Sequence, residues 1–174
     1  MLFYPQSYLY AVMLHGVLGA LDVFVNHEWL ARLPGRTDTA AEQRAHSARE
    51  LVFCLVFVSL GWFEWHGAAA CWIVLLYLAE VGLSAADAVI EGDTRVLPRP
   101  ERVLHLFLFM NLGVVLATVG PVLLAWQALP TQVVFVDHGW PGRVLGVMAA
   151  GSLAWAVRDA GSALRQRRQA MAGQ

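Results

Sequence analysis

The sequence predicts an all-α, polytopic transmembrane helix bundle of about five spans, four of which form a polar site. Hydrophobic residues make up 58% of the 174-residue chain and charged residues only 14%, a composition that soluble domains rarely have. The apolar residues also form long stretches, and a helix of about 20 residues crosses the hydrocarbon core of a bilayer. The chain therefore reads as one transmembrane helical domain over residues 1–160, followed by a basic tail over residues 161–174.

Five segments are long and apolar enough to be spans. In chain order they are Ser7–Val25, Arg44–Glu64, Gly67–Glu91, Glu101–Trp126 and Pro141–Arg158. The second is continuously apolar only over Leu51–Phe63, so it reaches full length only if the amphipathic stretch before it joins the helix. Very few residues separate it from the third span, which predicts a tight antiparallel hairpin. The tail after Gly161 is expected to be a frayed helix or disordered.

The arginines orient the chain. All twelve basic residues are Arg, and only Arg143 lies on the opposite side of the predicted bundle from the other eleven. The positive-inside rule then places the C-terminus in the cytoplasm and the N-terminus outside a bacterial cytoplasmic membrane. Five tryptophans would form an outer aromatic belt: Trp62, Trp65, Trp72, Trp126 and Trp140. The net charge of -1 argues against a nucleic-acid partner.

Polar side chains meet at the cytoplasmic ends of the first four predicted helices. They are Asp22 and Asn26 in the first, His46 and Glu50 in the second, Asp87 and Glu91 in the third, and Glu101 and His105 in the fourth. Each pair has i, i+4 spacing and therefore shares one helix face. Ionisable groups at membrane depth are costly, so they usually pair, line a pathway or bind a metal.

This set of side chains favours a metal site. Carboxylates and imidazoles suit iron, zinc and manganese, and a four-helix bundle that presents both is the plan of di-iron carboxylate proteins. The spacing here is Glu-x-x-x-His rather than Glu-x-x-His, so the analogy is chemical. The predicted ligands are His46, Glu50, Asp87, Glu91, Glu101, His105 and Asp22. They would hold two divalent transition-metal ions, with iron favoured and zinc or manganese as alternatives.

A second layer of polar residues is predicted to support these ligands. It comprises His15, Glu80, Asn26, Arg158 and Asn111. His15 and Glu80 each lie seven residues before a site acid, roughly 10 Å deeper in the bilayer, and are expected to face each other and share a proton. His27 and Glu28 could be extra ligands or lie in a solvated loop, and the loop is favoured.

The favoured function is a membrane-embedded di-iron oxidoreductase that acts on a lipid-soluble small molecule, with an electron donor or partner subunit on the cytoplasmic side. The first alternative is a zinc-dependent membrane hydrolase. Others are a non-enzymatic subunit, structural or haem-binding, and a small proton or ion transporter. The acids could also form a salt-bridge network with nearby arginines: Arg49, Arg95, Arg102 and Arg158. The sequence identifies no catalytic residue.

One stretch carries a family resemblance. Residues 90–105, IEGDTRVLPRPERVLH, together with Asn26-His27-Glu28 and the Arg158-Asp159 pair, resemble a signature of small, uncharacterised bacterial integral membrane proteins. The likeness would cover most of the chain. It implies a membrane location and brings no established activity.

Overall fold

The computed structural model describes residues 6–30, 32–33, 36 and 39–172. Five α-helices form the bundle: α1 (Ser7–Leu21), α2 (Ala40–Trp62), α3 (Cys71–Thr94), α4 (Arg99–Gln127) and α5 (Trp140–Ala172). The shorter elements are the π-helix η1 (Asp22–Leu30), the 3-10 helix η3 (Gly67–Ala70), and the strands β1 (Phe63–His66) and β2 (Gln132–Phe135). The predicted all-α bundle is confirmed, with one small sheet added.

Within the described part of the chain, four helical segments are long and apolar enough to cross a membrane. They are Ser7–Leu30, Ala40–Trp62, Gly67–Thr94 and Arg99–Gln127. Large apolar side chains cover their outer faces, as at Leu78, Val89 and Leu124, each more than 60% exposed. Such surfaces belong in lipid, because soluble monomers rarely expose extended apolar patches. The four segments correspond to the first four predicted spans.

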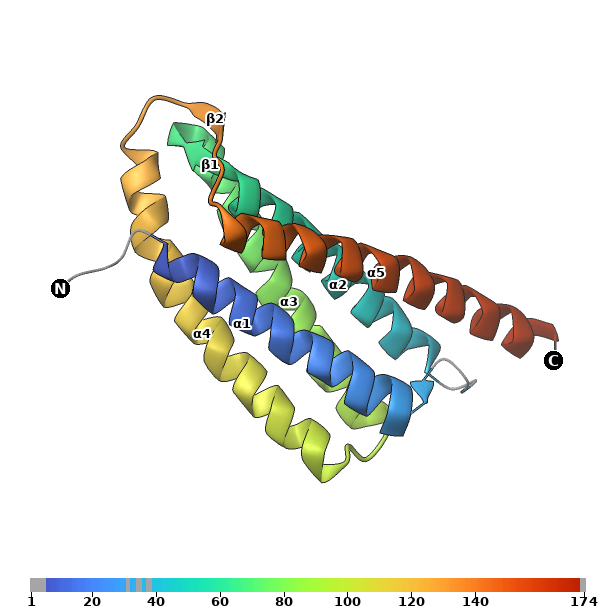
Figure 1. Ribbon diagram of the computed structural model, residues 1–174. Helices are drawn as coiled ribbons and strands as arrows, with labels where there is room; N and C mark the ends of the chain where they lie inside the picture. Colours follow the sequence, from blue (N-terminus) through green and yellow to red (C-terminus); the bar gives the residue numbers. More distant parts are fainter. Residues whose placement is uncertain (1–5, 31, 34–35, 37–38, 173–174) are drawn as a thin grey trace.

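The fifth predicted span, α5, is not among these four, yet it lies along α2 for the whole length of that helix (Figure 1). At one end the backbones meet so closely that a Cβ on Gly142 would lie 2.6 Å from the carbonyl oxygen of Gly61. At the other end, Ser47 Oγ donates to the carbonyl oxygen of Ala156 at 2.8 Å. The two helices are therefore antiparallel, and α5 crosses the same depth as α2.

The tail is more ordered than the sequence suggests. Helix α5 continues through Gly161 to Ala172, and residues 173–174 lie outside the described part. Gln166 is buried in this continuation, and its Nε2 donates to the carbonyl oxygen of Leu33 at 3.2 Å. The helix persists because it packs on the segment between η1 and α2, a contact that local sequence does not reveal.

Aromatic residues gather at the end of the bundle where β1 and β2 pair antiparallel, with Phe63 opposite Phe135. Between α2 and α3 the chain forms β1 and η3 rather than a bare hairpin. Gly67 makes the turn with φ +56°, and a Cβ there would meet the backbone of Thr131 at 2.7 Å. Ring contacts join Tyr8 to Trp126 at this end of the bundle. At the opposite end of the bundle, the C-terminal ends of α1 and α3 lie near the N-terminal ends of α2 and α4 (Figure 1).

Candidate metal site

The π-helix η1 turns the end of the first span into the bundle. In an α-helix, residues five positions apart point about 140° apart, whereas i→i+5 hydrogen bonding brings them one turn apart. Asp22 and His27 therefore share the inward face, and both are buried. Asn26 is buried beside them and donates Nδ2 to Asp22 Oδ1 at 2.7 Å. The common face of Asp22 and Asn26 is as predicted, whereas the expectation of a solvated loop at His27 is wrong.

His46 of α2 lies at the centre of this end. Its ring stacks on that of His27, with centroids 4.2 Å apart and planes 3° apart. Its Nε2 lies 3.3 Å from Glu91 Oε1 and 3.4 Å from Asp87 Oδ2. Because both acids come from α3, His46 ties η1, α2 and α3 together.

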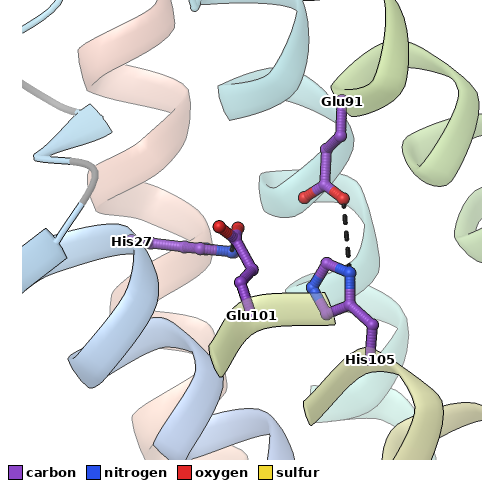
Figure 2. Close-up of side chains that lie close together, drawn as sticks. All are labelled: His27, Glu91, Glu101 and His105. Carbon is purple, nitrogen blue, oxygen red and sulfur yellow. Dashed lines mark ion pairs between the residues drawn. The ribbon is translucent and has the colours of Figure 1, made fainter. Parts of the chain in front are cut away.

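The fourth helix, α4, contributes His105 and Glu101. His105 Nε2 lies 3.1 Å from Asp22 Oδ2, and its Nδ1 lies 3.5 Å from Glu91 Oε2. Glu101 is fully buried, with Oε1 3.5 Å from His27 Nε2. Figure 2 shows His27, Glu91, Glu101 and His105 converging on one space, with the ion pair between Glu91 and His105 dashed.

Two groups of these side chains could hold a metal ion, because within each group the ligand atoms all lie within 4.8 Å of one another. The first group is His27, Glu91, Glu101 and His105, and the second is Glu42, His46 and Glu91. Glu91 belongs to both groups, so its carboxylate lies between the two candidate ion positions. Four predicted ligands, His46, Glu91, Glu101 and His105, lie in these groups.

Arg95 connects the two groups from the short loop between α3 and α4. It donates Nη2 to Glu42 Oε1 at 2.7 Å and Nη1 to Glu101 Oε2 at 2.8 Å. Burial alone would lower the pKa of Arg95, but its hydrogen bonds to Glu101 and Glu42 outweigh burial and raise the pKa above its ordinary value. Arg95 therefore stays charged and holds one acid of each group in place.

Arg49 likewise pairs with buried acids, on the side of the site that lies deeper in the bundle. Its Nη1 donates to Asp87 Oδ2 at 2.7 Å, and its Nη2 lies 3.6 Å from Glu80 Oε1. Asp87, a predicted ligand, is thus paired with Arg49 and His46 and lies outside both groups. The salt-bridge partners expected at Arg49 and Arg95 are present.

Several buried polar atoms in and around the site have no hydrogen-bond partner. They are His15 Nε2, Asn26 Oδ1, His27 Nε2, His46 Nδ1, Arg49 Nε, Glu80 Oε2 and Asp87 Oδ1. Leaving such atoms unsatisfied costs free energy, so each needs an explanation. A cavity of about 20 Å³, lined by residues including His15, Asp87 and Glu91, is large enough for one water molecule. The site thus has both unsatisfied ligand atoms and room for a small oxygen ligand.

The deeper layer differs from its prediction in one respect. Asn111 donates Nδ2 to the carbonyl oxygen of Ala11 at 3.1 Å, with His15 Nδ1 at 3.3 Å, so these two residues of the predicted layer lie in contact. His15 and Glu80, however, share no proton. Glu80 accepts from Ser84 at 2.6 Å, and the remaining atoms His15 Nε2 and Glu80 Oε2 are unpartnered. Arg49 takes the place facing Glu80 that the sequence had assigned to His15.

Two other predicted residues lie at the periphery. Glu50 lines an apolar cavity beside Ser152 and belongs to neither ligand group. Arg158 donates Nη2 to Glu28 Oε2 at 2.6 Å and Nη1 to Asp159 Oδ1 at 3.0 Å. It therefore holds the end of η1 to α5 rather than a ligand carboxylate.

The sequence prediction placed Arg49 only in the alternative salt-bridge network, favoured a loop position for His27, and did not include Glu42 among the ligands. Glu42 and Arg49 stand four residues before and three residues after His46, so both share the face of that histidine, and this spacing could have found them. No such signal marks His27, because α-helical geometry directs it away from Asp22. Only the π-helix brings it in.

The cavity beside Glu50 lies between α1, α2 and α5. Its volume is about 200 Å³ and its lining is mostly apolar, with Phe24, Phe53 and Phe57 among the lining residues. His27 and His46 also line it. The candidate ion positions are therefore next to an apolar chamber at membrane depth.

No family model, curated protein or solved structure matches the chain.

Proposed function

We propose that the protein is an integral membrane metalloprotein whose polar end binds two divalent metal ions and catalyses an oxidation or reduction of a lipid-soluble substrate. The observation that carries the proposal is the position of Glu91 in both ligand groups. A carboxylate can bridge two ions through its two oxygens, as in di-iron carboxylate bundles, and each oxygen of Glu91 already faces a histidine of one group. His27 and His105 would complete the first ion's ligands, and His46 the second's.

If all of the buried acids are ionised, the charge balance favours two ions over none. Six buried carboxylates face this region: Asp22, Glu42, Glu80, Asp87, Glu91 and Glu101. Arg49 and Arg95 pair with them, which leaves four negative charges. Protonation of His27, His46 and His105 would still leave one. Two divalent ions would balance all four with the imidazoles neutral, the state in which imidazole binds metal.

The apolar chamber favours a substrate that dissolves in the bilayer. A mixed carboxylate and imidazole set suits iron and also manganese or zinc. We favour iron, because two redox-active ions would exchange the electrons of the reaction with a donor in the cytoplasm. Zinc in the same ligands would instead activate water for hydrolysis, since a bound ion lowers the pKa of its water to about 7.

Elemental analysis tests the proposal. Protein expressed in metal-replete cells and purified in mild detergent is expected to contain close to two transition-metal ions per chain. Glu101→Gln, which removes a charged ligand from the first group, is expected to lower this value. The bridges of Arg95 favour a rival, a purely structural salt-bridge network. A folded, monodisperse wild-type protein without metal would establish that rival and refute the metal centre.

A further inference from the structure

The cavity between α1, α2 and α5 owes its space to small residues. Gly19 on α1 and Gly151 on α5 line it, and a Cβ added to either would meet no atom within 4 Å. Large side chains at these two positions would therefore project into open space. The cavity occurs where glycines on α1 and α5 leave space that larger side chains would otherwise fill.

The cavity has a closed deep end and a polar shallow end. A Cβ on Gly16 would lie 2.8 Å from Met148 Sδ and 2.9 Å from Phe57 Cζ, so the helices are in tight contact there. Eight residues further along the first span, Phe24 lines the cavity, and His27 and His46 lie at that end. The distance from Gly16 to Phe24 is roughly 12 Å along a helix axis. The chamber is thus elongated and ends at the candidate ions.

The surroundings determine what can enter. Gly19 and Gly151 belong to helices that cross the membrane depth, so the molecules that reach them are lipids. Away from the site most of the lining is apolar, with His15 as a polar residue beside Gly16, and such a lining suits a hydrocarbon chain. Near the site two carboxylates and one guanidinium line the cavity, those of Asp22, Glu50 and Arg49. Arg49 is already paired with Asp87. An anionic headgroup would be repelled, whereas an uncharged oxygen would not.

We infer that this cavity binds the hydrocarbon chain of an uncharged lipid, with its oxygen-bearing end at His27 and His46. The inference rests on the proposed metal centre for its chemistry but not for the binding itself. It narrows the substrate class to a long-chain alcohol, aldehyde or ester. It argues against a free fatty acid, whose carboxylate would meet the acids of the site.

Photolabelling tests the inference on the full-length protein in detergent. The probe is a 16-carbon primary alcohol that carries a diazirine on its chain, and adducts are mapped by mass spectrometry. We expect adducts on peptides of α1 and α5, reduced at least fivefold by excess 1-hexadecanol but not by the same concentration of palmitate. Gly19→Leu, which fills the cavity, is expected to reduce labelling at least fivefold.

The matched control is Gly82→Leu on α3. Gly82 also has open space around its Cβ position but does not line the cavity, so labelling should stay at the wild-type level. Gly151→Leu fills the cavity from α5, and it replaces Gly19→Leu in the experiment if Gly19→Leu does not fold. Unchanged labelling in a folded cavity-filling variant, or equal competition by palmitate, would overturn the inference.

Metal content separates this result from the metal proposal. Gly19→Leu should keep the wild-type metal content, because Gly19 is not among the ligands. Specific labelling in a protein without metal would support the lipid site while refuting the metal centre. Two bound ions per chain without specific labelling would support the metal centre and refute the lipid site.

Discussion

Replacement of Glu91 by glutamine is expected to remove both metal ions rather than one. The change keeps the size of the side chain and removes one negative charge at the point that the two ligand groups share. The ligand atoms of each group lie within 4.8 Å of one another, so an ion in either group would lie within that distance of a Glu91 oxygen. A unit charge and a divalent ion at about 4 Å and an effective dielectric constant of about 20 attract each other by about 8 kcal/mol, which corresponds to about a 10⁶-fold change in affinity.

The assay is metal content after dialysis against a buffered free-metal concentration, with size-exclusion chromatography and thermal unfolding as checks on the fold. Wild-type protein should retain close to two ions per chain, and Glu91→Gln close to none. The control is Glu28→Gln, a change of the same kind at an acid that pairs with Arg158 outside both groups. Retention of both ions by Glu91→Gln, with affinity within tenfold of wild type, would show that Glu91 does not bridge them.

Three further predictions concern orientation, the deeper layer and helix packing. A reporter fused after Gln174 is expected to read as cytoplasmic, and a cysteine at Gln132 to be labelled from outside; the opposite pattern would move the site to the outer face. Glu80→Gln is expected to weaken metal binding while the fold is kept, because Glu80 faces Arg49, Arg49 positions Asp87, and Asp87 contacts the candidate ligand His46; unchanged metal content with only lower thermal stability would make Glu80 a packing residue. Gly142→Ala is expected to destabilise the bundle by about 1–3 kcal/mol through overpacking, since its Cβ would meet the carbonyl oxygen of Gly61; an unchanged melting temperature would refute that contact.

The sequence predicted the features that depend on composition and topology. Long apolar stretches identified the helices, because crossing the bilayer requires them. Antiparallel order then brought the ends of α1 to α4 together, and i, i+4 spacing placed Glu91 and His105 on inward faces. Helical periodicity suffices for such residues, because their helices are regular at those positions.

Other features depend on contacts that periodicity does not encode. His27 enters the site only through a change in helix winding. Glu50 shares its face with His46 by spacing, yet α5 packs on α2 and leaves Glu50 beside Ser152. His15 and Glu80 lie at matching depths along their helices. The long side chain of Arg49, however, reaches between the helices and pairs with Glu80 in place of His15. These outcomes follow from tertiary packing, which the sequence pattern of a single helix does not contain.

The π-helix at the end of the first span makes the site sensitive to chain length. A π-helical turn is one residue longer than an α-helical one, so deleting one residue from η1 would let the segment rewind as α-helix. The histidine at position 27 would then lie four residues after Asp22, the spacing that shares one face of an α-helix. A single-codon deletion at Val23 would thus keep that imidazole on the face of Asp22, whereas rewinding of the segment without a deletion would turn it about 140° away from Asp22. For this site, the spacing of the chain carries as much information as the identity of its side chains.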